Sequence, residues 1–349
     1  MTRVHQVTGA AGPHDAVTGQ LLAYGDLLRG WGIEGGRHAV LVAPGASGEI
    51  QDLSRLDPAP DDLVLIHYSG WISGMASLLE LPQRKLLVYH NITPARYFWS
   101  VHPVVAVVCE LGREKLPALV AASKVSAAVS SYNAEELRGA GARDPRVVPI
   151  LLDPARLSHD GTSAPERGPL VLSVGRLSPH KRPDLVIRAF AHYQRVHAPD
   201  ARLLCAGPPQ HPQYLERLER LVEEVGARGV QLAGTLADEE LGRAYASASV
   251  LLTLSEHEGF CIPLLEAFHA GVPVIARPNG GMPEVGGDAV LWAGDGVDLS
   301  VVAELIHLAV SDSELRAELV RRGHVRAQEF APERVAEAVR GLIDAALAY

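Results

Sequence analysis

Two glutamates in the second half of the chain have the spacing of a binding element. Glu258 precedes Gly259, and Glu266 follows eight positions later, on a segment whose Pro263 suits the first turn of a helix. We therefore predict Glu258 on a loop and Glu266 about two turns down the helix, with the backbone amides of residues 260–262 exposed between them. Carboxylates accept hydrogen bonds from vicinal hydroxyls, so this spacing favours an elongated ligand with a sugar at one end and a ribose at the other.

Two cations precede this element in the chain. Arg176 and Lys181 lie between a predicted strand, Leu170–Val174, and a helix that we expect to begin at Pro183. A diphosphate carries about two negative charges near neutral pH, and two cations beside a helix N-terminus stabilise it as a leaving group. The pattern therefore indicates a diphosphate site after this strand.

The alternative interpretation is that the two glutamates and the two cations are ordinary surface charges. Two glutamates near a helix end, or an arginine and a lysine after a strand, are most often solvated. The strand–loop–helix context and the presence of both pairs in one half of the chain favour a binding site.

These segments resemble glycosyltransferases of family GT4, which have the GT-B fold. In that family the first glutamate of a Glu-x7-Glu element contacts the donor sugar and the second holds the nucleotide ribose, which implies these roles for Glu258 and Glu266. The resemblance also implies that Arg176 and Lys181 hold the donor diphosphate. The family often has glycine at the position of Cys261.

Weaker matches extend the resemblance to other loops. Thr235 and Leu236 lie in a segment similar to the family's loop that borders the nucleobase. His90 closes a predicted strand where the family often has a histidine near the donor sugar, and His67 ends the preceding strand, where it is placed to shape the acceptor side. Gly12 stands where relatives carry a glycine-rich loop near the diphosphate, although consecutive glycines are missing here.

The predicted site residues fall into two overlapping sets. For catalysis we predict Glu258, His90, Arg176 and Lys181. For donor binding we predict Arg176, Lys181, Thr235, Leu236, Glu258, Gly259, Phe260, Cys261, Ile262, Leu265, Glu266 and Gly12.

The sequence predicts no metal site and no cofactor beyond the nucleotide sugar, which is a co-substrate. The nearest pair of carboxylates, Asp61-Asp62, precedes a predicted strand instead of following one, and no Asp-x-Asp lies on a loop between strands. The cysteine and histidine spacings fit no zinc site. With Arg176 and Lys181 present, a divalent ion is not needed for departure of the leaving group.

Short apolar runs alternate with longer helical patterns, which is typical of parallel βαβ units. The predicted strands are Ala39–Ala43, Leu63–His67, Lys85–Tyr89, Val125–Val129, Val147–Ile150, Leu170–Val174, Arg202–Ala206, Val230–Leu232, Val250–Leu254 and Val272–Ala276. The predicted helices include Gly19–Arg29, Ala134–Arg138, Arg182–His197, one with Asp238 as its N-cap, Ile262–Ala270, and a helical tail, Leu299–Tyr349, broken near Ala331–Pro332.

The pattern divides the chain into two Rossmann-like, doubly wound α/β domains, and the resemblance to the GT-B fold implies that they face a central cleft. We predict an acceptor-side domain at 1–153, a Pro- and Gly-containing linker at 154–168, and a nucleotide-sugar domain at 169–330. Residues 331–349 should form a helix that crosses back to the first domain, as the resemblance implies.

The composition excludes several classes of partner. A net charge of −9 argues against nucleic acid, and no run of Lys or Arg marks a membrane-binding surface, although peripheral contact is left open. The N-terminal residues lack an apolar signal-peptide core and no stretch approaches a membrane span, so we expect a cytoplasmic protein.

The predicted function is sugar transfer from a UDP- or GDP-sugar to a glycan or small-molecule acceptor, with retention of configuration implied by the resemblance. A sugar-nucleotide epimerase, a phosphorylase or a non-catalytic partner subunit on the same fold are alternatives. A dinucleotide-dependent oxidoreductase would require Gly-x-Gly-x-x-Gly after an early strand, and Gly9–Gly12 does not supply it.

Overall fold

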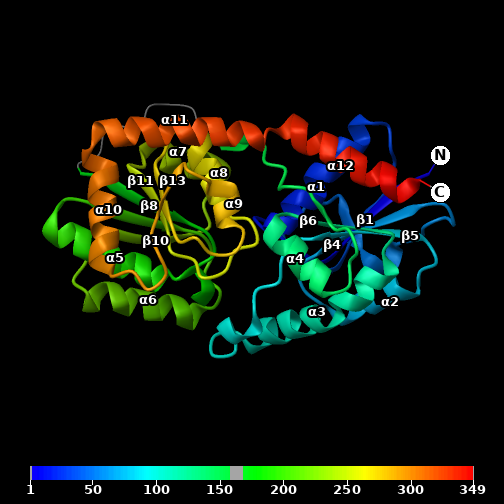
Figure 1. Cartoon of the computed structure of the whole chain (residues 1–349). Coiled ribbons are helices and arrows are strands. Elements are labelled where there is room, and N and C mark those ends of the chain that lie inside the picture. Colours follow the sequence, from blue (N-terminus) through cyan, green and yellow to red (C-terminus); the bar gives the residue numbers. More distant parts are fainter. Residues whose placement is uncertain (1, 158–167, 349) are drawn as a thin grey trace. The chain divides into compact units, whose positions relative to one another are not determined.

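The computed structural model describes residues 2–157 and 168–348, which form two compact units (Figure 1). Unit 1 comprises Met1–Arg96, Pro103–Leu151 and Phe330–Tyr349, and unit 2 comprises Tyr97–His102 and Leu152–Glu329. The last helix of the chain therefore belongs to unit 1. Of the predicted linker, residues 154–157 lie in unit 2, and residues 158–167 lie outside the described residues.

Unit 1 is built on a seven-stranded parallel sheet with helices on both of its faces (Figure 1). In spatial order the strands are β3 (Ile50–Asp52), β2 (Arg37–Val42), β1 (Val4–Ala11), β4 (Leu63–Tyr68), β5 (Arg84–Tyr89), β6 (Val125–Ala128) and β7 (Arg146–Val147). Its helices are α1 (Ala16–Gly30), η1 (Leu53–Arg55), η2 (Ser73–Met75), α2 (Ala76–Glu80), η3 (Ala95–Tyr97, whose last residue belongs to unit 2), α3 (Pro103–Ala122), α4 (Ser131–Gly139) and α12 (Pro332–Leu347).

The apolar pattern explains why these strands are central. Every residue of β4 is buried, as expected for a parallel strand that is covered on both faces. Helix α12 covers β5 and β6 with a stripe of apolar residues three or four positions apart. The stripe consists of Val335, Val339, Leu342, Ile343 and Ala346.

Unit 2 is built on a six-stranded parallel sheet. In spatial order its strands are β10 (Val230–Gly234), β9 (Arg202–Ala206), β8 (Leu170–Val174), β11 (Val250–Thr253), β12 (Val274–Ala276) and β13 (Val290–Trp292). Its helices are η4 (Pro154–Leu157), η5 (Pro179–Lys181), α5 (Pro183–Val196), α6 (Pro212–Glu224), α7 (Asp238–Ser247), α8 (Ile262–His269), α9 (Met282–Gly286), α10 (Leu299–Ser311) and α11 (Ser313–Glu329).

Each sheet has one point where the winding direction reverses. In unit 1, β2 and β3 lie on one side of β1, and β4 lies on the other side. In unit 2 the same reversal falls between β8 and β11. The crevice at the carboxyl ends of such strands is where doubly wound sheets bind ligands.

Most predicted elements are present, with a few corrections. The sequence pattern did not predict β1, β3, β13 or the long helix α3. The predicted strand Val147–Ile150 is wrong in extent, because β7 covers only Arg146–Val147. Asp238 is the first residue of α7 and not its N-cap, and the side chain of Glu240 accepts a hydrogen bond from the amide of the capping residue Ala237 at 2.9 Å.

Candidate functional site

Two loops of unit 2 follow neighbouring strands at the point where the winding reverses. The loop after β8 carries Arg176 and Lys181, and the loop after β11 carries Glu258. Gly175 opens the first loop with a φ of +140°, and a Cβ at this position would lie 3.8 Å from Nζ of Lys181. The lysine side chain thus folds back over the backbone at the end of β8.

Lys181 and Glu258 form an ion pair, although they are far apart in the sequence. Nζ of Lys181 donates to Oε1 of Glu258 at 2.5 Å, and the two side chains are 23% and 8% exposed. Burial works to lower the pKa of Lys181, but the Glu258 carboxylate, the nearby Cys261 and the hydrogen bond together raise it. The lysine is therefore charged at neutral pH, and Glu258 is not a solvated helix-end charge.

Arg176 adds a second positive charge close to this pair. Its side chain is exposed, while His180, between the two cations in sequence, is buried beneath the edge of the Phe98 ring at 5.6 Å between ring centroids. Burial, followed by Lys181, His257 and Arg176, lowers the pKa of His180 well below its usual value. His180 is thus neutral, and the charge of this loop lies on Arg176 and Lys181.

Arg182 and Glu256 join the two loops beside the ion pair. The Arg182 guanidinium donates to Oε1 of Glu256, and the backbone amide of Glu256 donates to the carbonyl of His180 at 2.7 Å. Arg182 also forms a two-pronged ion pair with Asp184, at 2.8 and 2.9 Å. These links fix Arg182, next to Lys181, and Glu256, two positions before Glu258. The sequence did not predict them, because a single carboxylate before the Glu-x7-Glu element carries no spacing signal.

The backbone of Glu258 is held by a third loop. Gly281 donates its amide to the Glu258 carbonyl at 2.9 Å. Gly280 has a φ of +61°, and a Cβ there would lie 2.0 Å from that carbonyl oxygen. Glycine at position 280 therefore permits the close approach that fixes Glu258.

Glu266 lies in the second turn of α8 and is 4% exposed. The hydroxyl of Tyr245, from α7, donates to its Oε2 at 2.7 Å. Burial raises the pKa of Glu266, and the Tyr245 hydrogen bond and Arg156 oppose the rise. Tyr245 was not predicted, because the contact joins two helices that are separated by a strand.

Cys261 adopts a backbone conformation that favours glycine. Its φ is +80° and its ψ is +73°, immediately before α8 begins at Ile262. The side chain is buried, and burial, followed by the Glu258 carboxylate, raises the pKa of the thiol well above its usual value. This conformation gives a physical reason for the glycine that the family often has at this position.

The remaining predicted residues of unit 2 differ in accessibility. Thr235 is exposed and Leu236 is half-buried, on the loop after β10. Gly259 and Ile262 are half-buried beside Glu258. The side chains of two predicted contact residues belong to the core, Phe260 at 5% exposure and Leu265 at 0%.

Two predicted residues, His90 and Gly12, belong to unit 1. His90 follows β5, and its Nε2 lies 3.0 Å from Nδ1 of His67. Burial lowers the pKa of His90 to about 3. The amide of Gly12 donates to Oγ1 of Thr18 at 3.1 Å, so it already has a partner, and Gly9 lies within β1 instead of in a glycine-rich loop.

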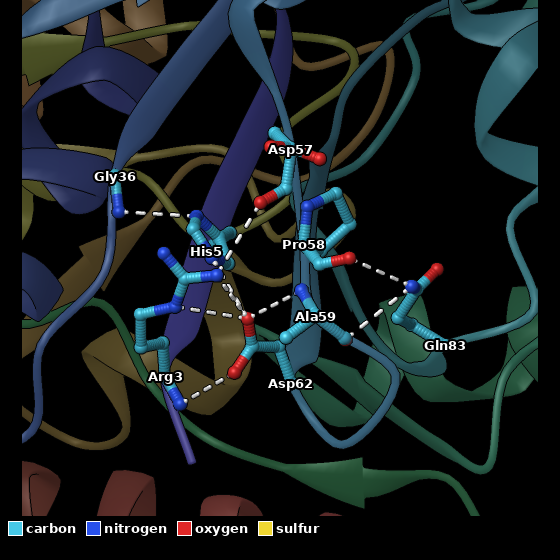
Figure 2. Close-up of polar contacts among 8 residues, drawn as sticks. All are labelled: Arg3, His5, Gly36, Asp57, Pro58, Ala59, Asp62 and Gln83. Carbon is cyan, nitrogen blue, oxygen red and sulfur yellow. Dashed lines mark hydrogen bonds and ion pairs between the residues drawn. The ribbon is translucent and has the colours of Figure 1, made fainter. Parts of the chain in front are cut away.

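Asp62 directly precedes β4, at the opposite, amino-terminal edge of the unit 1 sheet, and Figure 2 shows its polar contacts. Its carboxylate accepts hydrogen bonds from the backbone amides of Arg3 and Ala59 at 2.9 and 2.8 Å and from the Arg3 side chain at 3.0 Å. The ring of His5 completes this set at 3.4 Å. Both carboxylate oxygens of Asp62 thus accept hydrogen bonds from protein donors. Among residues 2–157 and 168–348, no three His, Cys, Asp or Glu side chains gather in a way that could hold a metal ion.

Residues 156–326 match the family model described as glycosyl transferases group 1. The chain carries a group 1 glycosyltransferase domain. The match confirms the resemblance to GT4-type enzymes on which the site residues were chosen, and it covers the loops that carry Lys181, Glu258 and Glu266.

Relatives and solved structures agree with this result. A D-inositol 3-phosphate glycosyltransferase of Acidothermus cellulolyticus is 33% identical over 61% of this chain and 50% of its own length. Sucrose-phosphate synthase from Thermosynechococcus elongatus superposes with a TM-score of 0.76 at 20% identity, over 99% of this chain and 98% of that one. The Anabaena protein HepE, solved in complex with UDP-glucose, has a TM-score of 0.76 at 16% identity, over 99% and 100%.

The two structural neighbours establish the two-domain GT-B fold. The chain spans about half the length of the first curated relatives it matches. No helix within the described ranges combines the length and apolar character needed to cross a membrane.

Proposed function

We propose that the chain transfers a sugar from a UDP- or GDP-sugar to a glycan or small-molecule acceptor, with retention of configuration and without a metal ion. The observation that carries the proposal is the ion pair between the half-buried Lys181 and the buried Glu258, with Arg176 nearby, at the reversal point of the unit 2 sheet. Residues with these chemistries at this place suit a ligand that is anionic at one point and rich in hydroxyls next to it.

Lys181 and Arg176 are the proposed partners of the donor diphosphate. The Glu258 carboxylate neutralises Lys181 in this structure. A diphosphate oxygen that takes the place of the carboxylate beside Nζ would free Glu258 to accept hydrogen bonds from sugar hydroxyls. The charge that develops on the leaving diphosphate would then be stabilised by cations that are already in position, which is an effective form of catalysis.

Glu266 is the proposed partner of the ribose. Tyr245 fixes one carboxylate oxygen, so the group is oriented before the ligand arrives. A relative of the same fold has been solved with UDP-glucose, which supports a uridine nucleotide as the first candidate. The inositol phosphate in the relatives' names supports a small hydroxyl-bearing acceptor as the first to test.

The donor is tested by thermal shift with UDP-, GDP-, ADP- and dTDP-sugars in excess EDTA. A ligand present at about 100 times its Kd stabilises the folded state by about 2.7 kcal/mol, which gives a clear shift. Transfer to inositol 3-phosphate or to a sugar acceptor is then measured with the donor that binds. Activity that is abolished by EDTA and restored by Mn²⁺ would contradict metal independence.

The two glutamates are distinguished by calorimetry. Glu266→Ala should weaken binding of the nucleoside diphosphate by about 1–3 kcal/mol, since the ribose contact exists in the free nucleotide. Glu258→Gln should leave that affinity nearly unchanged and lower kcat on the full donor. The reverse pattern would show that the two roles are exchanged.

A further inference from the structure

Three polar side chains of unit 1 form a continuous hydrogen-bonded chain. Gln6 comes from the middle of β1, His67 from β4, and His90 follows β5. Oε1 of Gln6 lies 2.9 Å from Nε2 of His67, and Nδ1 of His67 lies 3.0 Å from Nε2 of His90. The two imidazole rings are stacked, with centroids 5.2 Å apart and planes inclined by 26°.

Both imidazoles in this chain are neutral. Gln6 is 2% exposed and His67 is fully buried, in a T-shaped contact with the Tyr24 ring. Burial and then the neighbouring His90 lower the pKa of His67 well below its usual value, and burial lowers that of His90 to about 3. A neutral imidazole carries a single N–H, so one nitrogen of each ring donates and the other accepts.

The amide oxygen of Gln6 sets the direction of the chain. An amide oxygen only accepts, so Nε2 of His67 must carry the proton that it shares with Gln6. Nδ1 of His67 is then an acceptor, and Nε2 of His90 must donate to it. This leaves Nδ1 of His90 with a free lone pair.

That nitrogen has no partner in the described part of the chain. Nδ1 of His90 is buried and makes no hydrogen bond with any described residue. A buried acceptor without a donor is costly, and such groups in native structures commonly mark a place where a ligand or water binds. A neutral ring nitrogen with an unpaired lone pair suits a hydroxyl donor and does not suit a phosphate.

We propose that Gln6 and His67 are positioning residues that hold His90 as the Nε2–H tautomer, so that its Nδ1 accepts a hydrogen bond from a ligand hydroxyl. That the ligand is a sugar rests on the proposed function. The tautomer itself depends only on the contacts within unit 1, which allows the two ideas to be tested separately.

The direct test is nitrogen-15 NMR of the 349-residue chain without ligand near neutral pH, with histidine-selective labelling. Ring signals are assigned by their loss in His67→Gln and His90→Gln. We expect both residues to show a protonated Nε2 and an unprotonated Nδ1. A protonated Nδ1 on His90 would overturn the proposal, because it would mean that the Gln6 amide is turned and the chain runs in the opposite direction.

A matched pair of variants tests the role of Gln6. Gln6→Leu removes the acceptor that orients His67, so we expect the His90 signals to report a mixture of tautomers. Gln20→Leu removes another buried glutamine of unit 1, whose side chain hydrogen-bonds the backbone of Leu151, and should leave the tautomer unchanged. An unaltered tautomer in Gln6→Leu would contradict the positioning role.

Activity provides the second readout. With the nucleotide sugar that binds in the thermal-shift panel, Gln6→Leu should lower kcat/KM about tenfold, whereas Gln20→Leu should not lower it at equal folded content. Equal activity of the two variants would contradict the hydroxyl contact. If no nucleotide sugar supports transfer while the NMR tautomer is as expected, the proposed function fails and the assignment of Gln6 and His67 stands.

Discussion

Asp62 of unit 1 and Glu266 of unit 2 are both buried carboxylates, yet their surroundings move their pKa values in opposite directions. Burial alone would raise the pKa of Asp62, but the amides of Arg3 and Ala59 and the Arg3 side chain lower it to about 2 (Figure 2). Burial raises the pKa of Glu266, and a single tyrosine hydroxyl does not compensate.

The difference follows from the place of each group in its sheet. Asp62 lies at the amino-terminal edge, where its donors come from the first residues of the chain and from the loop before β4. Glu266 and the Lys181–Glu258 pair follow the carboxyl ends of strands, where doubly wound folds bind ligands. The Asp62 carboxylate accepts several hydrogen bonds from the protein, whereas the Glu266 carboxylate, which we propose binds a ligand, accepts one from Tyr245.

The largest expected effect is the loss of activity in Lys181→Met. The substitution removes the cation nearest Glu258, so kcat with the donor should fall by about 10²-fold or more. It also leaves the buried Glu258 carboxylate unpaired, which destabilises the folded state. Steady-state kinetics and thermal unfolding measure the two effects.

A double variant separates these contributions. Lys181→Met with Glu258→Gln removes the unpaired charge, so thermal stability should recover in part while kcat stays low. Lys115→Met, at a half-buried lysine of unit 1 that pairs with its neighbour Glu114, is the control and should change neither quantity by much. Recovery of turnover in the double variant would show that Lys181 serves only to neutralise Glu258.

The second effect concerns stability alone. Asp62 has a pKa of about 2 in the folded chain against 3.8 as its ordinary value, a difference worth about 2 kcal/mol of unfolding free energy. Since the folded pKa is lowered, this stability is fully present above about pH 4 and is lost as the pH falls toward 2. Asp62→Asn should therefore cost about 2 kcal/mol at pH 7 and progressively less at lower pH, by urea unfolding.

The adjacent Asp61 offers a matched control. Its side chain is exposed, so Asp61→Asn should change stability by less than about 0.5 kcal/mol at either pH. Neither variant should alter kcat, because Asp62 lies at the edge of the unit 1 sheet remote from the carboxyl ends of its strands. A cost for Asp62→Asn that does not vary with pH would show that shape, and not charge, holds this cluster.

The sequence predicted the strands that are continuous apolar runs. It did not predict a strand in which buried polar residues interrupt the apolar run. Strand β1 is central and almost wholly buried, but His5, Gln6 and Thr8 interrupt its apolar pattern. Two of these residues explain the interruption, because His5 contacts Asp62 and Gln6 contacts His67. A buried polar residue that is satisfied by a distant partner has no periodic signal.

The motifs of the candidate site could be predicted from the sequence, but the side-chain contacts between those motifs could not. Lys181 and Glu258 were placed on the two correct loops, since each follows an apolar strand. Their ion pair depends on β8 and β11 being neighbours, which follows from sheet order and not from local sequence. Tyr245 and Arg182 were missed for the same reason, because each acts on a residue of another element.

The smallest expected effect concerns the two buried cysteines of unit 2, which differ in backbone conformation. Cys205 lies in β9 and Cys261 has a φ of +80°; both side chains are buried. Replacement by glycine removes a small apolar group in each case, which costs about 1 kcal/mol or more. In a strand, glycine adds a cost of about 0.5–1 kcal/mol, but in the left-handed region it removes a strain of about 1–2 kcal/mol.

For Cys205→Gly, the cost of losing the buried side chain and the cost of glycine in a strand add. For Cys261→Gly, the cost of losing the side chain is opposed by the relief of backbone strain. We therefore expect Cys205→Gly to lower stability clearly and Cys261→Gly to change it by less than about 1 kcal/mol in either direction. Both residues belong to unit 2, so the two variants are compared by the same urea unfolding measurement. Equal losses of stability would mean that Cys261 is held mainly by the packing of its side chain among Lys181, Glu258 and Glu266, and that the site, not the helix start, selects a thiol at this position.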